Sequence, residues 1–318
     1  MSAIIYTHCD FDGAASAALV SFITGMEIFK FATPDNIRQQ GVNGEDIVCD
    51  LPYISGCHLW FDHHSSNLQE VRDRGLNPDN LPGKAVVAPS AAQVIYDYYR
   101  EQQDFPAYLQ ELVCATNIID TMGYKSIAEW LEPAPWNIIN ETININSESF
   151  PAMCHHLNWL TLELRQKSMA EIVKSEKILQ RYEQNLAARE RELDYIRKIY
   201  SFLPEDTEQK MLVLDCSELS YVPKFNKNLA LVVKPEAEYT LLIASDFNFG
   251  RKTNNLKISL SKNFLLNSDK KLGEFLEVMN IGGGHDNAAG GMIRSENKKD
   301  RLRKLHNFQL DLLDFLQS

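Results

Sequence analysis

Near its start the chain reads AIIYTHCDFDGAASAALVSFIT, residues 3–24. The letters AIIYT form a short apolar run typical of a buried strand, and the Ala-rich run that begins at Gly13 predicts a helix. Between them, His8, Asp10 and Asp12 alternate along an extended segment, so their side chains point to one face. Three close ligand-type side chains, two of them anionic, repel one another unless a cation neutralises them. The stretch therefore predicts a strand that leads into a metal-ligand motif and then into a helix.

The alternation of strands and helices continues from this stretch as far as Ile119. Apolar runs predict strands at 26–32, 46–49 and 58–61, and apolar spacing predicts helices at 88–99 and 105–119. Strands that alternate with helices indicate a parallel sheet covered on both faces, which belongs to the α/β class. Such sheets bind ligands outside the carboxyl ends of their strands. We therefore expect a site at that edge of the sheet.

Further polar residues follow the predicted strands and helices. Asp50 follows one strand, the triplet Asp62-His63-His64 follows the next, and Asp120 closes a helical run. Taken singly, Asp50 and Asp120 are more typical of caps or surface residues than of metal ligands. Hard divalent ions prefer carboxylate oxygens, and Mn²⁺-like ions also accept imidazole. Together with the first motif, these residues therefore predict a two-metal site that cleaves phosphate bonds.

A glycine-rich segment lies far downstream. It reads Gly282-Gly283-Gly284-His285 and continues as NAAGG to residue 291. Small residues allow backbone N–H groups to approach an anion, and His285 adds a donor. The alternative interpretation is a flexible turn. We favour a phosphate-binding loop, because the small residues extend past the length of a turn.

The length of 318 residues indicates two domains. We expect an α/β domain over 1–155, a helical connector over 156–204 and a smaller α/β domain over 205–318. Apolar residues recur with helical spacing in the connector, Leu179 among them, and we expect them to pack on the sheet domain; the alternative is a coiled-coil homodimer. The second domain should contain strands at 210–214, 229–233, 239–245 and 256–261, a strand near Met292, and helices at 272–279 and 298–316.

Charge and cysteine content restrict the partners and the compartment. The net charge is −11 and the pI is about 5.3, which argues against non-specific binding of long duplex DNA but permits a short anionic substrate. The six cysteines have irregular spacing, typical of reduced thiols in a cytoplasmic protein. As an alternative, Cys9 or Cys49 is a soft metal ligand. No signal-peptide pattern and no apolar run of membrane-spanning length occur, so no membrane partner is expected.

As a set and in this order, the motifs resemble those of the DHH phosphoesterases that carry a C-terminal DHH-associated domain, in the nano-RNase or oligoribonuclease-like branch. The resemblance covers most of the chain. It implies an N-terminal parallel-sheet DHH domain, a helical connector and a smaller C-terminal α/β domain, with the active site in the interdomain cleft. It also implies a Mn²⁺-dependent phosphoesterase that uses two divalent ions to hydrolyse short single-stranded oligonucleotides, dinucleotides or other small phosphorylated substrates.

The resemblance also implies individual roles. His64 would contact the scissile phosphate or the bridging water, and Asp62 would orient an imidazole. Asp50 would bridge both ions. The other metal ligands would be His8 and Asp10 for the first ion, and Asp12, His63 and Asp120 for the second. A distant phosphate or terminal nucleotide of the substrate would contact Gly283, Gly284 and His285.

One departure from the family leaves the substrate open. Relatives often carry Ser-Leu-Arg-Ser on a strand of the second domain, where the Arg clamps a phosphate. Here residues 259–262 read Ser-Leu-Ser-Lys, so Lys262 or Arg251 is the candidate replacement. The alternatives are an exopolyphosphatase- or pyrophosphatase-like hydrolase of phosphoanhydrides, or a catalytically weak binding or regulatory protein.

Overall fold

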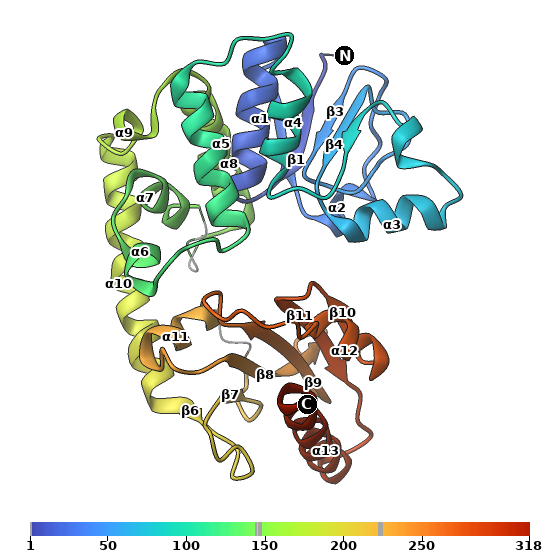
Figure 1. Ribbon diagram of the computed structural model, residues 1–318, viewed down its shortest axis with the longest axis vertical. Coiled ribbons are helices and arrows are strands. Elements are labelled where there is room, and N and C mark those ends of the chain that lie inside the picture. Colours follow the sequence, from blue (N-terminus) through green and yellow to red (C-terminus); the bar gives the residue numbers. More distant parts are fainter. Residues whose placement is uncertain (1, 144, 146–147, 222–224) are drawn as a thin grey trace. The chain divides into compact units, whose positions relative to one another are not determined.

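The computed structural model describes residues 2–143, 145, 148–221 and 225–318. These residues divide into two compact units (Figure 1). Unit 1 comprises Met1–Tyr124 and Ala128–Asn185, and unit 2 comprises Lys125–Ile127 and Leu186–Ser318. The predicted α/β class is confirmed in both units, each of which contains one sheet covered by helices.

Unit 1 is built on a five-stranded sheet in the order β2-β1-β3-β4-β5. All of its neighbouring strands are parallel, as the alternation of strands and helices predicted. The fifth strand, at the edge, was missed because only three residues form it. The strands are β1 (Ile5–His8), β2 (Phe29–Ala32), β3 (Ile47–Cys49), β4 (Leu59–Asp62) and β5 (Gly83–Ala85).

Both faces of this sheet are buried, because successive side chains of each strand enter different cores. Ile5 and Phe61 belong to the core shared with the larger helices, whereas Tyr6, Val48 and Trp60 belong to a second core on the other face. The first core lies under α1 (Phe11–Thr24), α4 (Ala91–Tyr99), α5 (Ala107–Asp120) and α8 (Phe150–Gln166), and the second lies under α2 (Pro34–Ile37) and α3 (Ser65–Asp73).

Helix α1 lies inside its core, since every side chain from Phe11 to Ser21 is buried. Its alanines permit close packing against α4, α5 and α8, with which it makes many contacts. Helix α8 joins this core through Leu157, Leu160 and Leu164, three residues of the range expected for the connector. The remaining short elements are the 3₁₀ helix η1 (Pro78–Asn80), α6 (Ile127–Leu131), α7 (Pro135–Glu141) and α9 (Met169–Ile172).

The expected connector contains the long helix α10 (Glu176–Ile199). The part of this helix up to Asn185 belongs to unit 1, and the rest belongs to unit 2. Its buried side chains include Ile178, Leu193 and Ile196, whereas Leu179 is 45% exposed. The exposure of Leu179 departs from the expected apolar stripe, because neighbouring Ile178 takes the inward position. None of the helices among the described residues combines the length and the apolar character needed to cross a membrane.

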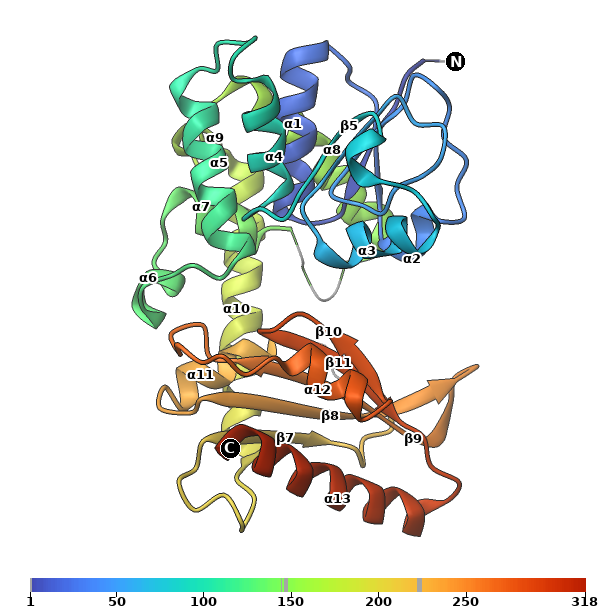
Figure 2. The same cartoon turned by 45° about the vertical axis from the view of Figure 1, so that its right-hand side comes forward.

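Unit 2 contains a six-stranded mixed sheet in the order β10-β11-β9-β8-β7-β6 (Figure 2). Alternate residues of β9, Leu256, Ile258 and Leu260, face a core that helix α13 covers. The strands are β6 (Tyr200–Ser201), β7 (Met211–Cys216), β8 (Tyr239–Asn248), β9 (Arg251–Lys262), β10 (Gly282–Gly284) and β11 (Ala288–Ile293). Helix α12 (Leu272–Val278) follows β9, and the longer helix α13 (Lys298–Gln317) follows β11.

One predicted strand of unit 2 is wrong. Residues 229–233 form the end of a 3₁₀ helix, η2 (Lys227–Leu229), and a short helix, α11 (Ala230–Val233). A five-residue apolar run does not distinguish a strand from a buried helix by periodicity. Asn226 decides in favour of the helix, since its side chain caps the amide of Asn228 at the start of η2.

The packing around α1 yields a test of unit 1. Leu19→Ala should lower the free energy of unfolding by about 2–5 kcal/mol, because Leu19 is fully buried and the helices around it collapse only partly into a cavity. Leu179→Ala is the matched control, expected to change it by at most about 0.5 kcal/mol. Urea unfolding followed by circular dichroism measures both, and equal effects would contradict this account of the core.

Candidate metal centre

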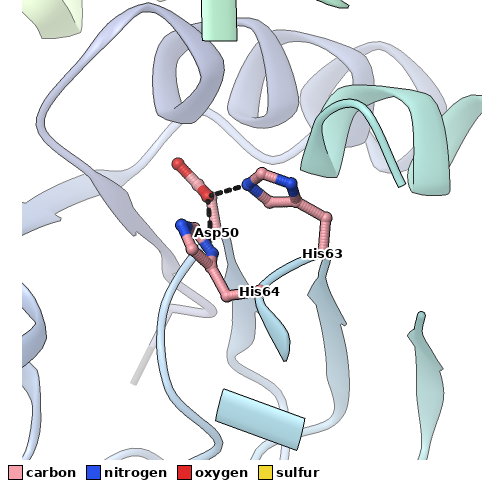
Figure 3. Close-up of side chains that lie close together, drawn as sticks. All are labelled: Asp50, His63 and His64. Carbon is pink, nitrogen blue, oxygen red and sulfur yellow. Dashed lines mark ion pairs between the residues drawn. The ribbon is translucent and has the colours of Figure 1, made fainter. Parts of the chain in front are cut away.

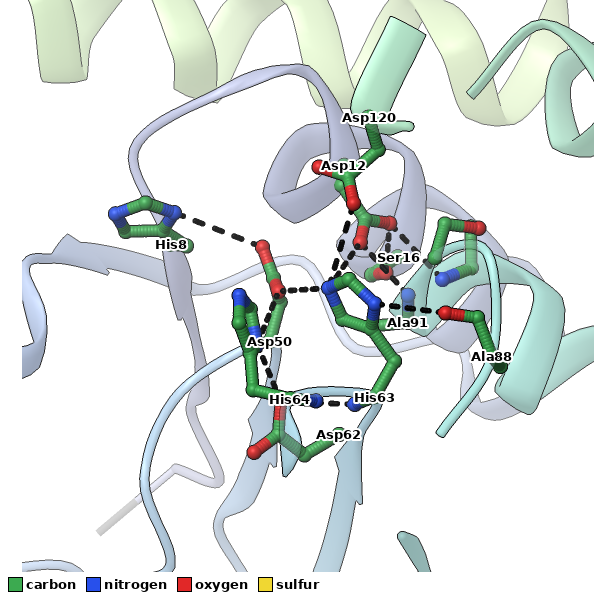
Figure 4. Close-up of polar contacts among 12 residues, drawn as sticks. His8, Asp12, Ser16, Asp50, Asp62, His63, His64, Ala88, Ala91 and Asp120 are labelled. Carbon is green, nitrogen blue, oxygen red and sulfur yellow. Dashed lines mark hydrogen bonds and ion pairs between the residues drawn. The ribbon is translucent and has the colours of Figure 1, made fainter. Parts of the chain in front are cut away.

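The sheet of unit 1 brings the predicted residues together at the carboxyl ends of three adjacent strands. His8 ends β1, Asp50 follows β3, and Asp62 ends β4, and these strands are neighbours in the order β1-β3-β4. The ends of two helices complete the group, since Asp12 lies in the first turn of α1 and Asp120 is the last residue of α5. Figure 4 shows this group of polar side chains.

The turn between β1 and α1 is held by Asp10. Its side chain caps α1 by accepting a hydrogen bond of 2.9 Å from the Gly13 amide. Its other oxygen lies 2.6 Å from His8 Nδ1. Gly13 is required here, because a Cβ atom at this position would lie 2.0 Å from the His8 carbonyl oxygen. The turn therefore holds His8 and Asp10 against each other.

Asp12 connects the motif to helix α4. Its carboxylate accepts hydrogen bonds from the first two amides of that helix, Ala91 at 2.7 Å and Ala92 at 2.9 Å, and from the Ser16 hydroxyl at 3.1 Å. An anion at a helix N-terminus is stabilised by the unpaired amides and the helix dipole. Asp12 is thus fixed in place, with only 2% of its surface exposed.

Asp50 lies at the centre of the group. Its backbone takes a φ of 55°, in the left-handed region, directly after β3, and its amide bonds to the Phe61 carbonyl at 2.8 Å. Asp tolerates this conformation better than most residues, but such strain persists only where the surroundings enforce it. The residue is 2% exposed, and neither of its carboxylate oxygens has a hydrogen-bond partner among the described residues. A buried carboxylate in this state requires a cation or a proton.

His63 points a bare nitrogen at three carboxylates. Its Nδ1 lies 3.1 Å from the Ala88 carbonyl oxygen, which can only accept, so Nδ1 carries the proton. In the neutral imidazole the lone pair is then on Nε2, an atom that is buried and has no hydrogen-bond partner among the described residues. This nitrogen lies 3.5 Å from Asp50 Oδ1, 3.5 Å from Asp120 Oδ2 and 3.7 Å from Asp12 Oδ2. A lone pair directed at carboxylate oxygens is repulsive unless a positive charge lies between them.

His64 is held differently. Figure 3 shows it beside Asp50 and His63. Its Nδ1 lies 3.6 Å from Asp50 Oδ1. The same nitrogen donates to Asp62 Oδ1 at 2.9 Å. Asp62 is fully buried, and its second oxygen accepts a hydrogen bond of 2.6 Å from Asn67 on α3. Sequence analysis missed Asn67, because nothing in the sequence relates it to the site.

The donor atoms fit divalent cations. Three groups have donor atoms within 4.8 Å of one another, and each combines carboxylate with imidazole: His8, Asp10 and Asp50; Asp12, His63 and Asp120; Asp50, His63 and His64. The first two contain the residues that the resemblance implied for the first and the second ion, and Asp50 belongs to the first group and to the third. None of the three groups contains a cysteine, so neither Cys9 nor Cys49 joins them.

The electrostatics of the group favour a bound cation. Burial, reinforced by the Asp12 and Asp10 carboxylates, raises the pKa of Asp50 well above its usual range. The same causes raise the pKa of Asp120 to about 8. Divalent ions would reverse this effect, since a nearby positive charge stabilises the ionised carboxylates.

The glycine-rich segment of unit 2 is a hairpin rather than a loop. Gly282, Gly283 and Gly284 form β10, which pairs with β11. Gly284 has a φ of 149°, and a Cβ atom there would lie 2.6 Å from the Ala288 carbonyl oxygen, so close pairing explains this glycine. The His285 amide bonds to the same oxygen at 2.8 Å and is not available to an anion. The exposed side chain of His285 remains the candidate binding group.

The two candidate cations lie at opposite ends of one strand. Lys262 ends β9 beside this hairpin, with its amide 2.9 Å from the Asn287 carbonyl oxygen. Arg251 begins the same twelve-residue strand, roughly 35 Å away at the usual rise per residue. Arg251 therefore cannot act on a ligand held at the hairpin. Lys262 stays a candidate, although its ammonium group donates to the Ser268 carbonyl at 2.8 Å.

No protein-family model matches the chain, and no curated protein matches it. Solved structures do match. A pGpG-specific phosphodiesterase from Vibrio cholerae superposes with a TM-score of 0.72 at 22% identity, covering 98% of this chain and 99% of that one. The DHH domain of a protein assigned to a family of ribosomal proteins superposes with a TM-score of 0.56 at 12% identity, covering 98% of this chain and 86% of that one.

This chain has the fold of the DHH phosphoesterases. An exopolyphosphatase-related protein from Bacteroides fragilis shares it, with a TM-score of 0.52 at 13% identity and coverage of 98% and 92%. The similarity extends over almost the whole chain, including both units. The DHH fold expected from the motifs is thus confirmed.

The position of Asp50 predicts how metal is bound. Asp50→Asn should abolish tight binding at both positions, because it removes the negative charge shared by two ligand groups while keeping the side-chain volume. Asp12→Asn should weaken binding at one position only. Isothermal titration with Mn²⁺ and metal analysis after gel filtration measure this. Asp35→Asn, on the exposed surface, is the control, and two tightly bound ions in the Asp50 variant would contradict this assignment.

The turn at Gly13 predicts a separate effect. Gly13→Ala should weaken metal binding at least ~10-fold, because the added methyl group collides with the backbone of His8 and forces the β1–α1 turn to open. The free energy of unfolding should fall as well, by more than the ~0.5 kcal/mol typical of a harmless surface change. Gly41→Ala, where a Cβ atom meets nothing within 4 Å, is the control. Unchanged metal affinity in Gly13→Ala would contradict the close approach at this turn.

Proposed function

We propose that this protein is a divalent-metal-dependent phosphoesterase that hydrolyses dinucleotides or short oligonucleotides with two ions. The bare Nε2 of His63 is the observation that carries the proposal. This buried lone pair and the unpartnered oxygens of Asp50 face each other at 3.5 Å, an arrangement that is stable only around positive charge. The structural similarity to a pGpG-specific phosphodiesterase supports the substrate class.

The ligand sets we propose are His8, Asp10 and Asp50 for one ion, and Asp12, His63, Asp120 and Asp50 for the other. When bound, such ions would polarise phosphate oxygens and supply hydroxide from water near neutral pH. The Ala88 carbonyl keeps His63 in the tautomer that a ligand requires. Burial of Asp12 and Asp50 excludes bulk water and strengthens every charge interaction in the site.

His64 and Asp62 have a different role in this proposal. Asp62 accepts a hydrogen bond from the Nδ1–H of His64 and thereby fixes both the tautomer and the orientation of the ring. His64 can then bind a proton at Nε2 and, as imidazolium, donate to a phosphate oxygen while charge develops there. Asn67 and the His63 amide hold Asp62 in turn, so His64 is oriented before substrate arrives.

The proposed ion is Mn²⁺. Each ligand group mixes imidazole with carboxylate, which suits Mn²⁺, whereas Mg²⁺ prefers an octahedron of oxygens and retains several waters. In unit 2 we propose that His285, Gly283, Gly284 and Lys262 contact the substrate. A phosphoanhydride substrate is the second candidate, favoured by the similarity to the exopolyphosphatase-related protein.

A substrate panel tests the function. Linear and cyclic dinucleotides, RNA and DNA of 2–10 nucleotides, adenosine bisphosphate and polyphosphate would be incubated with the full-length protein and Mn²⁺. We expect linear dinucleotides to give the highest kcat/KM, activity to vanish with EDTA, and Mg²⁺ to restore less of it than Mn²⁺. Asp50→Asn controls for contaminating nucleases. Hydrolysis that persists in EDTA or in that variant would refute the metal mechanism, and hydrolysis of polyphosphate alone would select the second candidate.

A further inference from the structure

The turn between β8 and β9 carries a fully exposed aromatic side chain. Asn248 pairs with Arg251 across the hairpin, so Phe249 and Gly250 form a two-residue turn at the projecting end of these strands (Figure 2). Phe249 is 100% exposed. Transfer of so large an apolar surface out of water is favourable, and aromatic residues dominate the energetics of protein interfaces. The turn is therefore a candidate contact for another surface.

The backbone conformation of Phe249 is unfavourable for an aromatic residue. Its φ is 47°, and the φ of Gly250 is 75°. Two-residue turns with positive φ at both positions favour Asn, Asp or Gly, because bulky side chains rarely adopt this conformation. Phe249 therefore weakens the hairpin through its backbone and gains no stability from packing within the chain. Strain of this kind is explained by a contact that the single molecule does not make.

Unit 1 has an apolar pocket that suits an aromatic side chain. It lies among α5, α7 and α9, which are close together in Figures 1 and 2, and its volume is about 540 Å³. This size is within the range of ordinary ligand sites. An aromatic ring placed there would displace water from apolar side chains. The apolar part of the wall of this α5–α7–α9 pocket includes Ala107, Ala115, Ile118, Pro135, Trp136 and Met169.

The turn and the pocket have complementary charges. Arg251 is exposed directly after the turn, and Glu111 is an exposed residue of the pocket wall. Among the described residues, neither has an oppositely charged group within 4.0 Å. Unit 1 contains 24 Asp and Glu residues and 11 Lys and Arg residues, whereas unit 2 contains 19 and 21. The acidic unit of one molecule therefore attracts the slightly basic unit of a second molecule.

We propose that the protein self-associates by inserting the Phe249 turn of one molecule into the α5–α7–α9 pocket of another, with Arg251 beside Glu111. The contact joins two separate molecules and involves none of the proposed metal ligands, so it goes beyond the proposed function. Burial of one Phe side chain changes affinity about 10- to 100-fold, and association must also offset the lost freedom of the two molecules. The complex is therefore weak and depends on concentration and salt.

Sedimentation velocity of the full-length protein over a concentration series measures this association. The wild type should shift from monomer to oligomer as its concentration rises, and added salt should reverse the shift. Phe249→Asn should weaken association about 10- to 100-fold. It should also leave the melting temperature unchanged or higher, because Asn suits the turn, whereas a structural role of Phe249 would lower that temperature. Ala170→Trp, at an exposed position of the pocket wall, should fill the pocket and weaken association as well.

A charge exchange tests whether the contact is between molecules. Arg251→Glu and Glu111→Lys should each weaken self-association, because a turn then meets a pocket of the same charge. An equal mixture of the two variants should restore association, since each turn can then meet a pocket of opposite charge on the other variant. A contact within one chain would not be restored by mixing.

Two further variants separate this contact from other apolar surfaces. Val278→Ala removes a side chain of unit 2 that is 84% exposed, and it should leave association unchanged. Leu179→Ala tests the coiled-coil alternative on α10. The proposal fails if the wild type is monomeric at every concentration, if Phe249→Asn leaves association unchanged, if the mixed charge variants stay apart, or if Leu179→Ala is the change that abolishes association.

Discussion

The site in unit 1 depends on an electrostatic conflict that the protein cannot relieve by itself. Asp12, Asp50 and Asp120 surround the buried Nε2 of His63 at 3.5–3.7 Å, in a place where two of these carboxylates are almost fully buried. Water screens such groups poorly at this depth, so protons or cations have to compensate them. Three features keep these groups close together: the strained backbone of Asp50, the hydrogen bonds that Asp12 accepts from α4, and the hydrogen bond between His63 and the Ala88 carbonyl. Each is difficult to explain as a contribution to stability alone.

The sheet supplies the rigidity that this conflict requires. Asp50 follows a strand only three residues long, but that strand lies between β1 and β4, and both of its faces are buried. Packing in two cores therefore resists the backbone shifts that would move the carboxylates apart. Helix α4 contributes in a second way, because its first amides neutralise Asp12 in part and fix it toward His63.

In unit 2, a lysine from another element contacts the strand whose Ser-Leu-Ser-Lys segment contains no arginine. The strand that lacks an arginine retains small hydroxyl side chains, and η2 brings Lys227 to the same strand. Arg251 and Lys262, the two cations expected from the sequence to take part in binding, lie at opposite ends of β9. Residues at the two ends of a long strand lie far apart, although they are close in sequence. An element that crosses the strand can bring residues that are distant in sequence into contact with it.

The sequence by itself determined the α/β class, the parallel sheet of unit 1 and which polar motifs gather at one edge of that sheet, because strand periodicity and the positions of polar residues after strands are local properties. It did not determine the state of residues 229–233, where a short apolar run fits a helix and a strand equally well and the Asn226 cap decided. It did not reveal that β10 is a paired strand, since that requires β11 beside it. Asn67 and Lys227 were also invisible, because their contacts span 5 and 32 residues of chain, respectively. Only the tertiary structure joined Asp12, Asp50, His63 and Asp120 around one point, since parallel strands collect at one edge side chains that the chain itself keeps far apart.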